Sequence, residues 1–96
     1  MKKQKSNKSN KSNKIDTVDI IKEYNSDALL ADGFNDAIIG MCHQFDRPPV
    51  VAYDFEKVIF ILMKDKMSRE EAIEFWEYNM VGAGMGDNNC VYIEKL

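Results

Sequence analysis

Acidic side chains recur at helical spacing near the C-terminal end of the chain. Glu70, Glu74 and Glu77 are four and three residues apart, which places them along one face of a helix. Carboxylates on a rigid helix that face water attract cationic protein surfaces over long range. We therefore predict a partner-binding surface on and after this helix. Its predicted residues are Glu70, Glu74, Glu77, Asp87 and Met85, with Met85 as an exposed apolar contact.

The chain has two cysteines and one histidine, the residue types of nucleophilic and metal sites. Cys42 and His43 are neighbours in a predicted strand, so their side chains point to opposite faces, whereas Cys90 can be placed across the sheet from His43. One imidazole and one thiol are too few for a zinc site, and a Cys–His nucleophile also needs an orienting group and an oxyanion hole. We predict no catalytic residues, no metal and no cofactor.

Two further patterns match ligand sites only in part. Asp27, Asp32 and Asp36 lack the alternating oxygen ligands and the distal glutamate of a calcium loop. Asp32 and Asp36 are instead expected to cap turns around Gly33. The glycines in 82–86 follow a helix and precede a strand, which is the reverse of the dinucleotide-binding order, so they predict a helix stop and a loop.

Length and charge narrow the class of protein. The 96 residues, 45% hydrophobic and 30% charged, suit one small domain and are too few for a (β/α)8 barrel or a two-halved dinucleotide fold. No apolar run reaches the roughly 18 residues of a membrane span. The net charge of -3 combines two unlike parts: residues 1–14 hold six lysines and no acid, whereas 15–96 hold seven cations and all 16 acids. We predict a disordered Lys/Ser/Asn-rich tail at 1–14 and a single domain at 15–96.

The first half of this domain reads as a helix followed by a hairpin. A helix is expected over about 17–24, capped by Asp16 or Thr17. Ala37–Phe45 and Val50–Tyr53 have the β-branched and aromatic content of strands. The intervening Asp46–Pro49 segment, with two adjacent prolines, is expected to form the turn.

The second half reads as two helices and a strand. Asp54 is expected to cap a helix whose apolar positions follow the i, i+3, i+4, i+7 pattern, and Ser68 with Glu71 forms a capping box for a helix over about 69–80. The last strand, Cys90–Glu94, is expected to return beside the first, either antiparallel or parallel by a crossover. The predicted buried stripe of the 69–80 helix is Ala72, Phe75, Trp76 and Met80, broadened by Ile73.

These elements predict an α+β fold in the order α-β-β-α-α-β. A small antiparallel sheet of about three strands would carry the helices on one face. Because the other face then lacks a cover, a homodimer formed through it is a reasonable hypothesis.

The order of several short motifs resembles that of a family of small, largely uncharacterised proteins of tailed bacteriophages. The family pattern is A-D-G-F, A-x-I-G, Q-F, P-V-x-x-Y-D, E-E-A and N-x-x-G-A, and it covers about residues 28–93. The matching residues here are Ala31-Asp32-Gly33-Phe34, Ala37-Ile38-Ile39-Gly40, Gln44-Phe45, Pro49-Val50, Tyr53-Asp54, Glu70-Glu71-Ala72, Tyr78-Asn79 and Gly82-Ala83. The chain departs at Gly86–Cys90, where the family tends to have G-E-x-T-P. The resemblance implies a phage protein that acts in the cytoplasm of an infected bacterium.

Three functional hypotheses follow. The first is a non-enzymatic accessory protein that binds a host protein, as an inhibitor whose carboxylates occupy a basic site. The second is a protein that binds or sequesters a small molecule or nucleotide in a pocket. The polar residues for that pocket are Asp32, Gln44, Tyr53 and Asn79. The third is nucleic-acid contact through the lysine-rich tail.

Overall fold

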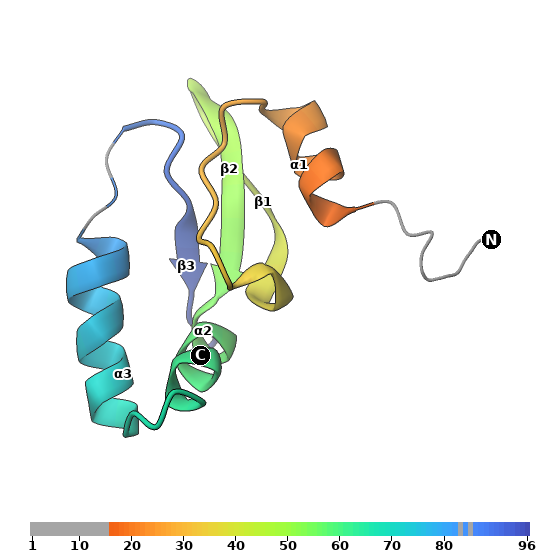
Figure 1. Cartoon of the computed structure of the whole chain (residues 1–96). Helices are drawn as coiled ribbons and strands as arrows, with labels where there is room; N and C mark the ends of the chain where they lie inside the picture. The colour runs from red at the N-terminus through yellow and green to blue at the C-terminus, as the bar shows by residue number, and fades with distance from the viewer. Residues whose placement is uncertain (1–15, 83, 85) are drawn as a thin grey trace.

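The computed structural model of this chain describes residues 16–82, 84 and 86–96. The predicted α+β class and element order are confirmed (Figure 1). The predicted tail at 1–14 lies outside the described residues. Among the described residues, no helix is long and apolar enough to cross a membrane. The elements are α1 (Thr17–Tyr24), a 3-10 turn (Asn35–Ala37), β1 (Ile38–Gln44), β2 (Arg47–Asp54), α2 (Phe55–Met63), α3 (Arg69–Trp76), a π-helical turn (Glu77–Val81) and β3 (Val91–Ile93).

The hairpin of β1 and β2 has a tighter turn than predicted. The strands are antiparallel and pair Gln44 with Arg47, so that only Phe45 and Asp46 form the turn. Asp46 has a φ of 65°, the left-handed conformation that aspartate tolerates in hairpin turns. The two prolines therefore begin β2 instead of forming the turn. Adjacent N–H positions of a strand point to opposite sides: one proline position faces the edge where β3 begins only opposite Ala52, and the other meets β1 at the register shift between Cys42 and Gln44.

The position of the last strand differs from the prediction. β3 pairs with β2, not with β1, and the pairing is parallel, with Tyr53 opposite Tyr92. The sheet is therefore mixed, in the order β1-β2-β3. Because the chain crosses over through α2 and α3 before it returns, a parallel strand on the free edge of β2 is the short connection. The central position of β2 buries it from Val50 to Asp54.

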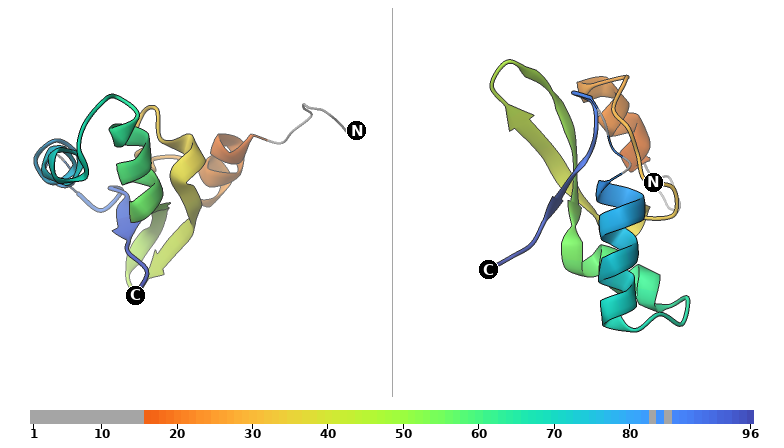
Figure 2. Two further views of the ribbon diagram at one scale, coloured as in Figure 1. Left: turned by 90° about the horizontal axis from the view of Figure 1, so that it is seen from below. Right: turned by 90° about the vertical axis from the view of Figure 1, so that its left-hand side faces the viewer.

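The hydrophobic core lies between the sheet and the helices. Val51 and Tyr53 of β2 pack against Val58, Ile59 and Leu62 of α2, and each of the five is at most 4% exposed. Ile21 docks α1 and Ala72 docks α3 onto the same cluster. The right-hand view of Figure 2 shows all three helices on one side of the sheet, as predicted, and none of the described elements on the other.

The helix starts follow their predicted caps. The Asp16 carboxylate accepts from the Val18 amide at 3.1 Å. The Asp54 carboxylate accepts from the Lys57 amide at 3.3 Å. The capping box of α3 is complete: the Ser68 hydroxyl accepts from the Glu71 amide, and the Glu71 carboxylate accepts from the Ser68 amide.

The end of the 69–80 helix departs from a regular α-helix. After Trp76 the backbone widens into the π-helical turn, in which the Gly82 amide donates to the Glu77 carbonyl. Ala72, Ile73, Trp76 and Met80 pack on the core as predicted, but Phe75 does not and is 38% exposed. The prediction for Phe75 was wrong because the apolar stripe on this helix is narrower than the sequence pattern.

Candidate functional site

The predicted acidic residues of α3 form one continuous surface, here called the acidic face: Glu70, Glu74 and Glu77. Glu70 and Glu74 lie on α3 and Glu77 begins the π-helical turn, and all three are exposed. None of them forms an ion pair within the part of the chain that the structure describes. Their carboxylates thus face water in a row.

The one arginine of α3 does not neutralise this row. Arg69 donates two hydrogen bonds of 2.9 Å to the Glu56 carboxylate of α2. These hydrogen bonds hold the pKa of the Glu56 carboxyl below its usual value. The bidentate geometry ties the start of α3 to α2 and commits the guanidinium away from the acidic face.

Aromatic side chains flank the acidic face. Tyr78 is 76% exposed and Phe75 is partly exposed on the same side of the helix. They line a shallow groove of about 470 Å³ together with Glu71, Glu74, Lys66, Met67 and Asn79. Exposed tyrosine next to carboxylates is typical of protein-binding surfaces, because the ring supplies contact area at low entropic cost.

The two other predicted members of this surface lie elsewhere or cannot be placed. Asp87 lies in the loop before β3, where its carboxylate is 3.9 Å from the Arg47 guanidinium of β2. Asp87 therefore links that loop to the hairpin instead of extending the acidic face. Met85 lies outside the described residues.

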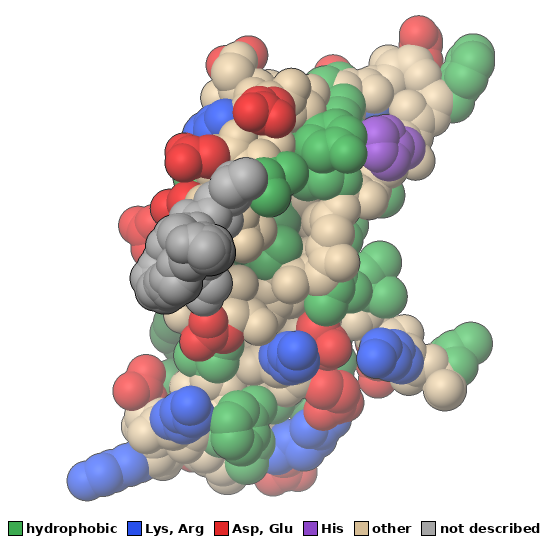
Figure 3. All heavy atoms as spheres, turned by 90° about the vertical axis from the view of Figure 1, so that its right-hand side faces the viewer, with side chains coloured by type: hydrophobic (Ala, Val, Ile, Leu, Met, Phe, Trp, Pro, Cys, Tyr) green, Lys and Arg blue, Asp and Glu red, His purple; other side chains and the backbone are tan. Residues whose placement is uncertain are grey.

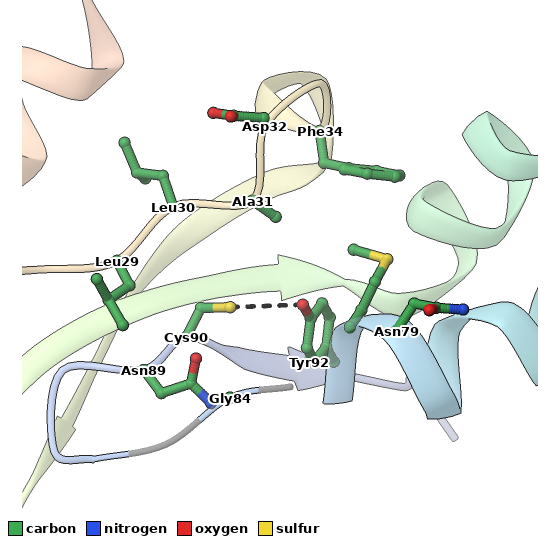
Figure 4. Close-up of a pocket in the computed structure, with 11 residues that line it drawn as sticks. Leu29, Leu30, Ala31, Asp32, Phe34, Asn79, Gly84, Asn89, Cys90 and Tyr92 are labelled. Carbon is green, nitrogen blue, oxygen red and sulfur yellow. Dashed lines mark hydrogen bonds between the residues drawn. The ribbon is translucent and has the colours of Figure 1, made fainter. Parts of the chain in front are cut away.

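A second hollow lies between the 28–34 segment, the π-helical turn and the start of β3 (Figure 4). We call it the upper groove; its volume is about 500 Å³. Most of its lining is apolar. The lining residues are Leu29, Leu30, Ala31, Asp32, Phe34, Asn79, Met80, Gly84, Asn89, Cys90 and Tyr92.

Two hydrogen bonds, from the Leu29 and Ala31 amides, hold the 28–34 wall of the upper groove. The Leu29 amide donates to the Asn88 carbonyl at 3.0 Å. The Ala31 amide donates to the Tyr53 hydroxyl at 2.8 Å. Gly33 turns the chain with a φ of 89°, as predicted for a left-handed turn residue.

An aromatic cluster forms the floor below the upper groove. Tyr53 stacks on Tyr92 with ring centroids 5.8 Å apart, and Trp76 meets the edges of Tyr92 and Phe55. Burial raises the pKa of both tyrosines, and a hydrogen bond between Tyr92 and the Cys90 thiol, at 3.5 Å, raises that of Tyr92 further. Both hydroxyls therefore stay protonated at neutral pH.

The structure brings together only part of the predicted polar pocket. Asp32 and Asn79 line the upper groove, and Tyr53 lies beneath it. Gln44 does not belong to it, because it ends β1 at the hairpin and contacts Cys42. In Figure 4 the Asp32 carboxylate and the Asn79 carboxamide point away from each other. These two polar groups of the described lining therefore do not converge on one ligand position.

Sequence reasoning missed most of the upper groove. Its apolar walls, Leu30, Phe34 and Met80, follow no common period, and only the family-like A-D-G-F motif marked this stretch. Cys90 and Tyr92 were assigned to a strand, but their neighbours depended on the position of β3. The π-helical turn, which presents Asn79 and Met80, had no signal in the sequence.

The cysteines and the histidine are not assembled into a site. β2 lies between the strand of His43 and the segment of Cys90, so the predicted proximity of the two was wrong. His43 instead meets the Tyr24 ring edge-on at 6.0 Å, and Figure 3 shows the histidine beside hydrophobic side chains. Cys42 and Cys90 are free thiols, and no three potential ligands meet within the described residues.

Comparisons with known proteins add no assignment. No family model, no curated protein and no solved structure matches this chain. The resemblance to phage proteins stays a prediction.

Proposed function

We propose that this chain is a non-enzymatic accessory protein that binds another protein through the acidic face of α3. One observation carries the proposal: three carboxylates line up on one exposed helix face while the only arginine of that helix is committed to Glu56. A row of this kind provides a local negative field and accelerates encounter with a basic partner.

The acidic face does not serve the stability of the fold. Like charges at i, i+4 and i, i+3 destabilise a helix by about 0.2–0.5 kcal/mol per pair. Glu70 gains from the positive end of the helix dipole, but Glu74 and Glu77 lie beyond the first turn. A helix that keeps these two carboxylates at a small cost in stability is consistent with a role in binding.

The partner that we propose is a nucleic-acid-handling protein of an infected bacterium, inhibited in its cytoplasm. Its basic site normally contacts phosphates, and Glu70, Glu74 and Glu77 would occupy the same positions. Tyr78, the most exposed aromatic beside the acidic face, supplies the apolar anchor. The phage-like motif order supports a bacterial host protein as the partner, and the carboxylates of α3 support a basic site on it.

Charge reversal with a matched control tests the proposal. The triple variant Glu70/Glu74/Glu77→Lys is compared with Glu23/Asp27/Asp36→Lys, which changes the net charge equally at exposed acids of α1, the turn after it and the 3-10 turn, all outside α3 (Figure 1). Immobilised wild type and the control should capture the same protein from bacterial lysate, whereas the α3 variant should lose it. Equal capture by all three proteins would exclude the acidic face as the binding surface.

A second candidate function is small-molecule or nucleotide binding in the upper groove. Its volume of about 500 Å³ and its apolar lining favour this function. The divergent directions of Asp32 and Asn79 make it the weaker candidate. Thermal denaturation in the presence of a panel of nucleotides tests it: a ligand that raises Tm in the wild type but not in Phe34→Ala supports the site, and an unchanged Tm throughout refutes it.

A further inference from the structure

The shallow groove of about 470 Å³ beside the acidic face, here called the α3 groove, has aromatic walls. Phe75 and Tyr78 line it with their exposed rings, and Met67 lines it near the start of α3. The helix lies at the periphery of the molecule, where a partner can reach it (Figure 2). Two exposed rings beside a hollow are typical of a contact site, because neither ring is needed to fill the core.

The two carboxylates that line the α3 groove differ in their partners. Glu71 accepts a hydrogen bond from the Ser68 amide at 2.8 Å, so its carboxylate is committed to the cap of α3. Glu74 forms no ion pair within the described residues, and Tyr78 follows it four residues further along the chain. A group that fills the groove beside Tyr78 therefore meets an aromatic ring and an unpaired carboxylate together.

Arginine is the side chain whose chemistry fits this combination. Its planar guanidinium stacks on aromatic rings and donates two parallel hydrogen bonds to a carboxylate, while its aliphatic stem covers apolar walls. A lysine ammonium also pairs with a carboxylate, but it is strongly hydrated and has no plane to stack. We propose that the α3 groove takes an arginine side chain of the partner, with its guanidinium between the Tyr78 ring and the Glu74 carboxylate.

The inference rests on the proposed function, because it specifies the basic group with which the partner meets the acidic face. Arginine binds phosphates through the same two-pronged geometry that it uses with carboxylates. A site that otherwise contacts nucleic-acid phosphates is therefore expected to offer arginine side chains. The α3 groove adds a ring contact that phosphates do not provide.

Other occupants of the α3 groove are disfavoured by its charge. A nucleic-acid base also stacks on exposed rings, but its phosphates would then lie near the carboxylates of Glu70, Glu74 and Glu77, which repel them. A purely apolar side chain would desolvate the Glu74 carboxylate without giving it a partner, which costs free energy. An arginine covers the rings and pairs the carboxylate at once.

Binding of labelled hexa-arginine and hexa-lysine to the full chain tests the inference. Fluorescence anisotropy is measured at about 0.15 M salt, where charges more than about 8 Å apart are largely screened. The wild type should bind hexa-arginine at least about threefold more tightly than hexa-lysine, which is the size expected of one exposed cation–π contact. Glu74→Gln should weaken hexa-arginine binding at least about threefold, whereas Glu23→Gln, at an exposed acid of α1, should not.

Substitutions of Tyr78 identify the ring as the source of the preference. Tyr78→Leu should abolish the preference for hexa-arginine, whereas Tyr78→Phe keeps a ring and should retain it. Tyr24→Leu is the matched control, because it removes an exposed ring from α1 and should leave the preference unchanged.

The outcomes separate this inference from the proposed function. Equal affinity of the wild type for the two peptides, or a preference for arginine that survives Tyr78→Leu, would overturn the arginine site. If Glu70/Glu74/Glu77→Lys then still loses both peptides, the acidic face stands without it. Binding of neither peptide by the wild type would count against both proposals.

The wild type decides the question should Tyr78→Leu fail to fold by circular dichroism. The ring resonances of Tyr78 should shift during titration with hexa-arginine and should shift less with hexa-lysine, while those of Tyr24 stay constant with both peptides. Equal shifts of the Tyr78 ring with the two peptides would overturn the arginine site.

Discussion

The hydroxyl oxygen of Tyr53 anchors the wall of the upper groove by accepting a hydrogen bond from the Ala31 amide. Removing this hydroxyl tests how much the anchor stabilises the fold. In Tyr53→Phe the ring still stacks on Tyr92, but the Ala31 amide loses the hydroxyl that it donates to at 2.8 Å. Tyr53 is fully buried, whereas Ala31 is partly buried at the groove. The variant therefore tests whether the 28–34 segment is anchored to the core through this bond.

The size of the effect follows from the burial of the two groups. A buried donor that loses its partner costs about 1–3 kcal/mol, and partial access of water to Ala31 favours the lower half of that range. We expect a loss of about 1–2 kcal/mol in the free energy of unfolding. For a folded part of this size, about 4–8 °C of Tm corresponds to 1 kcal/mol. The variant should therefore melt roughly 5–15 °C below the wild type.

Tyr92→Phe is the matched control. Among the described residues its hydroxyl has one hydrogen-bond partner, the Cys90 thiol at 3.5 Å, and sulfur is a weak hydrogen-bonding group, so we expect a change within about 0.5 kcal/mol. Thermal and urea unfolding followed by circular dichroism give both values, and amide exchange of Ala31 gives a local readout. Equal stability of the two variants, or unchanged exchange of Ala31 in Tyr53→Phe, would refute the anchoring role.

Three further predictions concern pH, capping and the N-terminal segment. Burial raises the folded pKa of Tyr92 above its ordinary value of 10.0. The contribution of protonated Tyr92 to the free energy of unfolding should therefore be fully present below pH 10 and should be lost as the pH rises above it. In urea unfolding, the free energy of unfolding of Tyr92→Phe should fall less steeply with alkaline pH than that of the wild type. An identical slope in the two proteins would contradict the assignment of this loss to Tyr92. Ser68→Ala should lower the free energy of unfolding by about 1 kcal/mol, because the Ser68 hydroxyl caps α3. Ser26→Ala is the control and should leave this free energy unchanged, because the Ser26 hydroxyl caps no helix among the described residues. Deleting residues 1–14 should abolish any salt-sensitive binding to duplex DNA in filter binding and leave capture through α3 intact; retained DNA binding would place it on the domain.

Local signals in the sequence predicted most of the helix starts. Asp16, Asp54 and the Ser68–Glu71 box each satisfy amides within three residues, so their effect depends on little else. The predicted helix over 17–24 agrees with α1 for the same reason. The hairpin was recognised from its β-branched strands, but the turn was misplaced because prolines favour turns and the first residues of strands alike.

The remaining features of the fold depend on contacts between segments far apart in the sequence, so local patterns did not predict them. A strand as short as β3 has no register of its own, and its place beside β2 depends on how α2 and α3 return the chain. The π-helical turn rotates every side chain after Trp76 relative to a regular helix, which the sequence period does not encode. Of the residues predicted for a polar pocket, Asp32 and Asn79 line the upper groove, whereas Gln44 lies at the hairpin.

The central claim is that the acidic face occupies a site that otherwise binds nucleic-acid phosphates. The most direct measurement is equilibrium competition between this protein and a 20-base-pair DNA duplex for the protein captured from lysate, followed by fluorescence anisotropy of the labelled duplex. We predict mutual exclusion: wild type should displace the duplex completely, and Glu70/Glu74/Glu77→Lys should not. A ternary complex that holds duplex and protein together would contradict the claim.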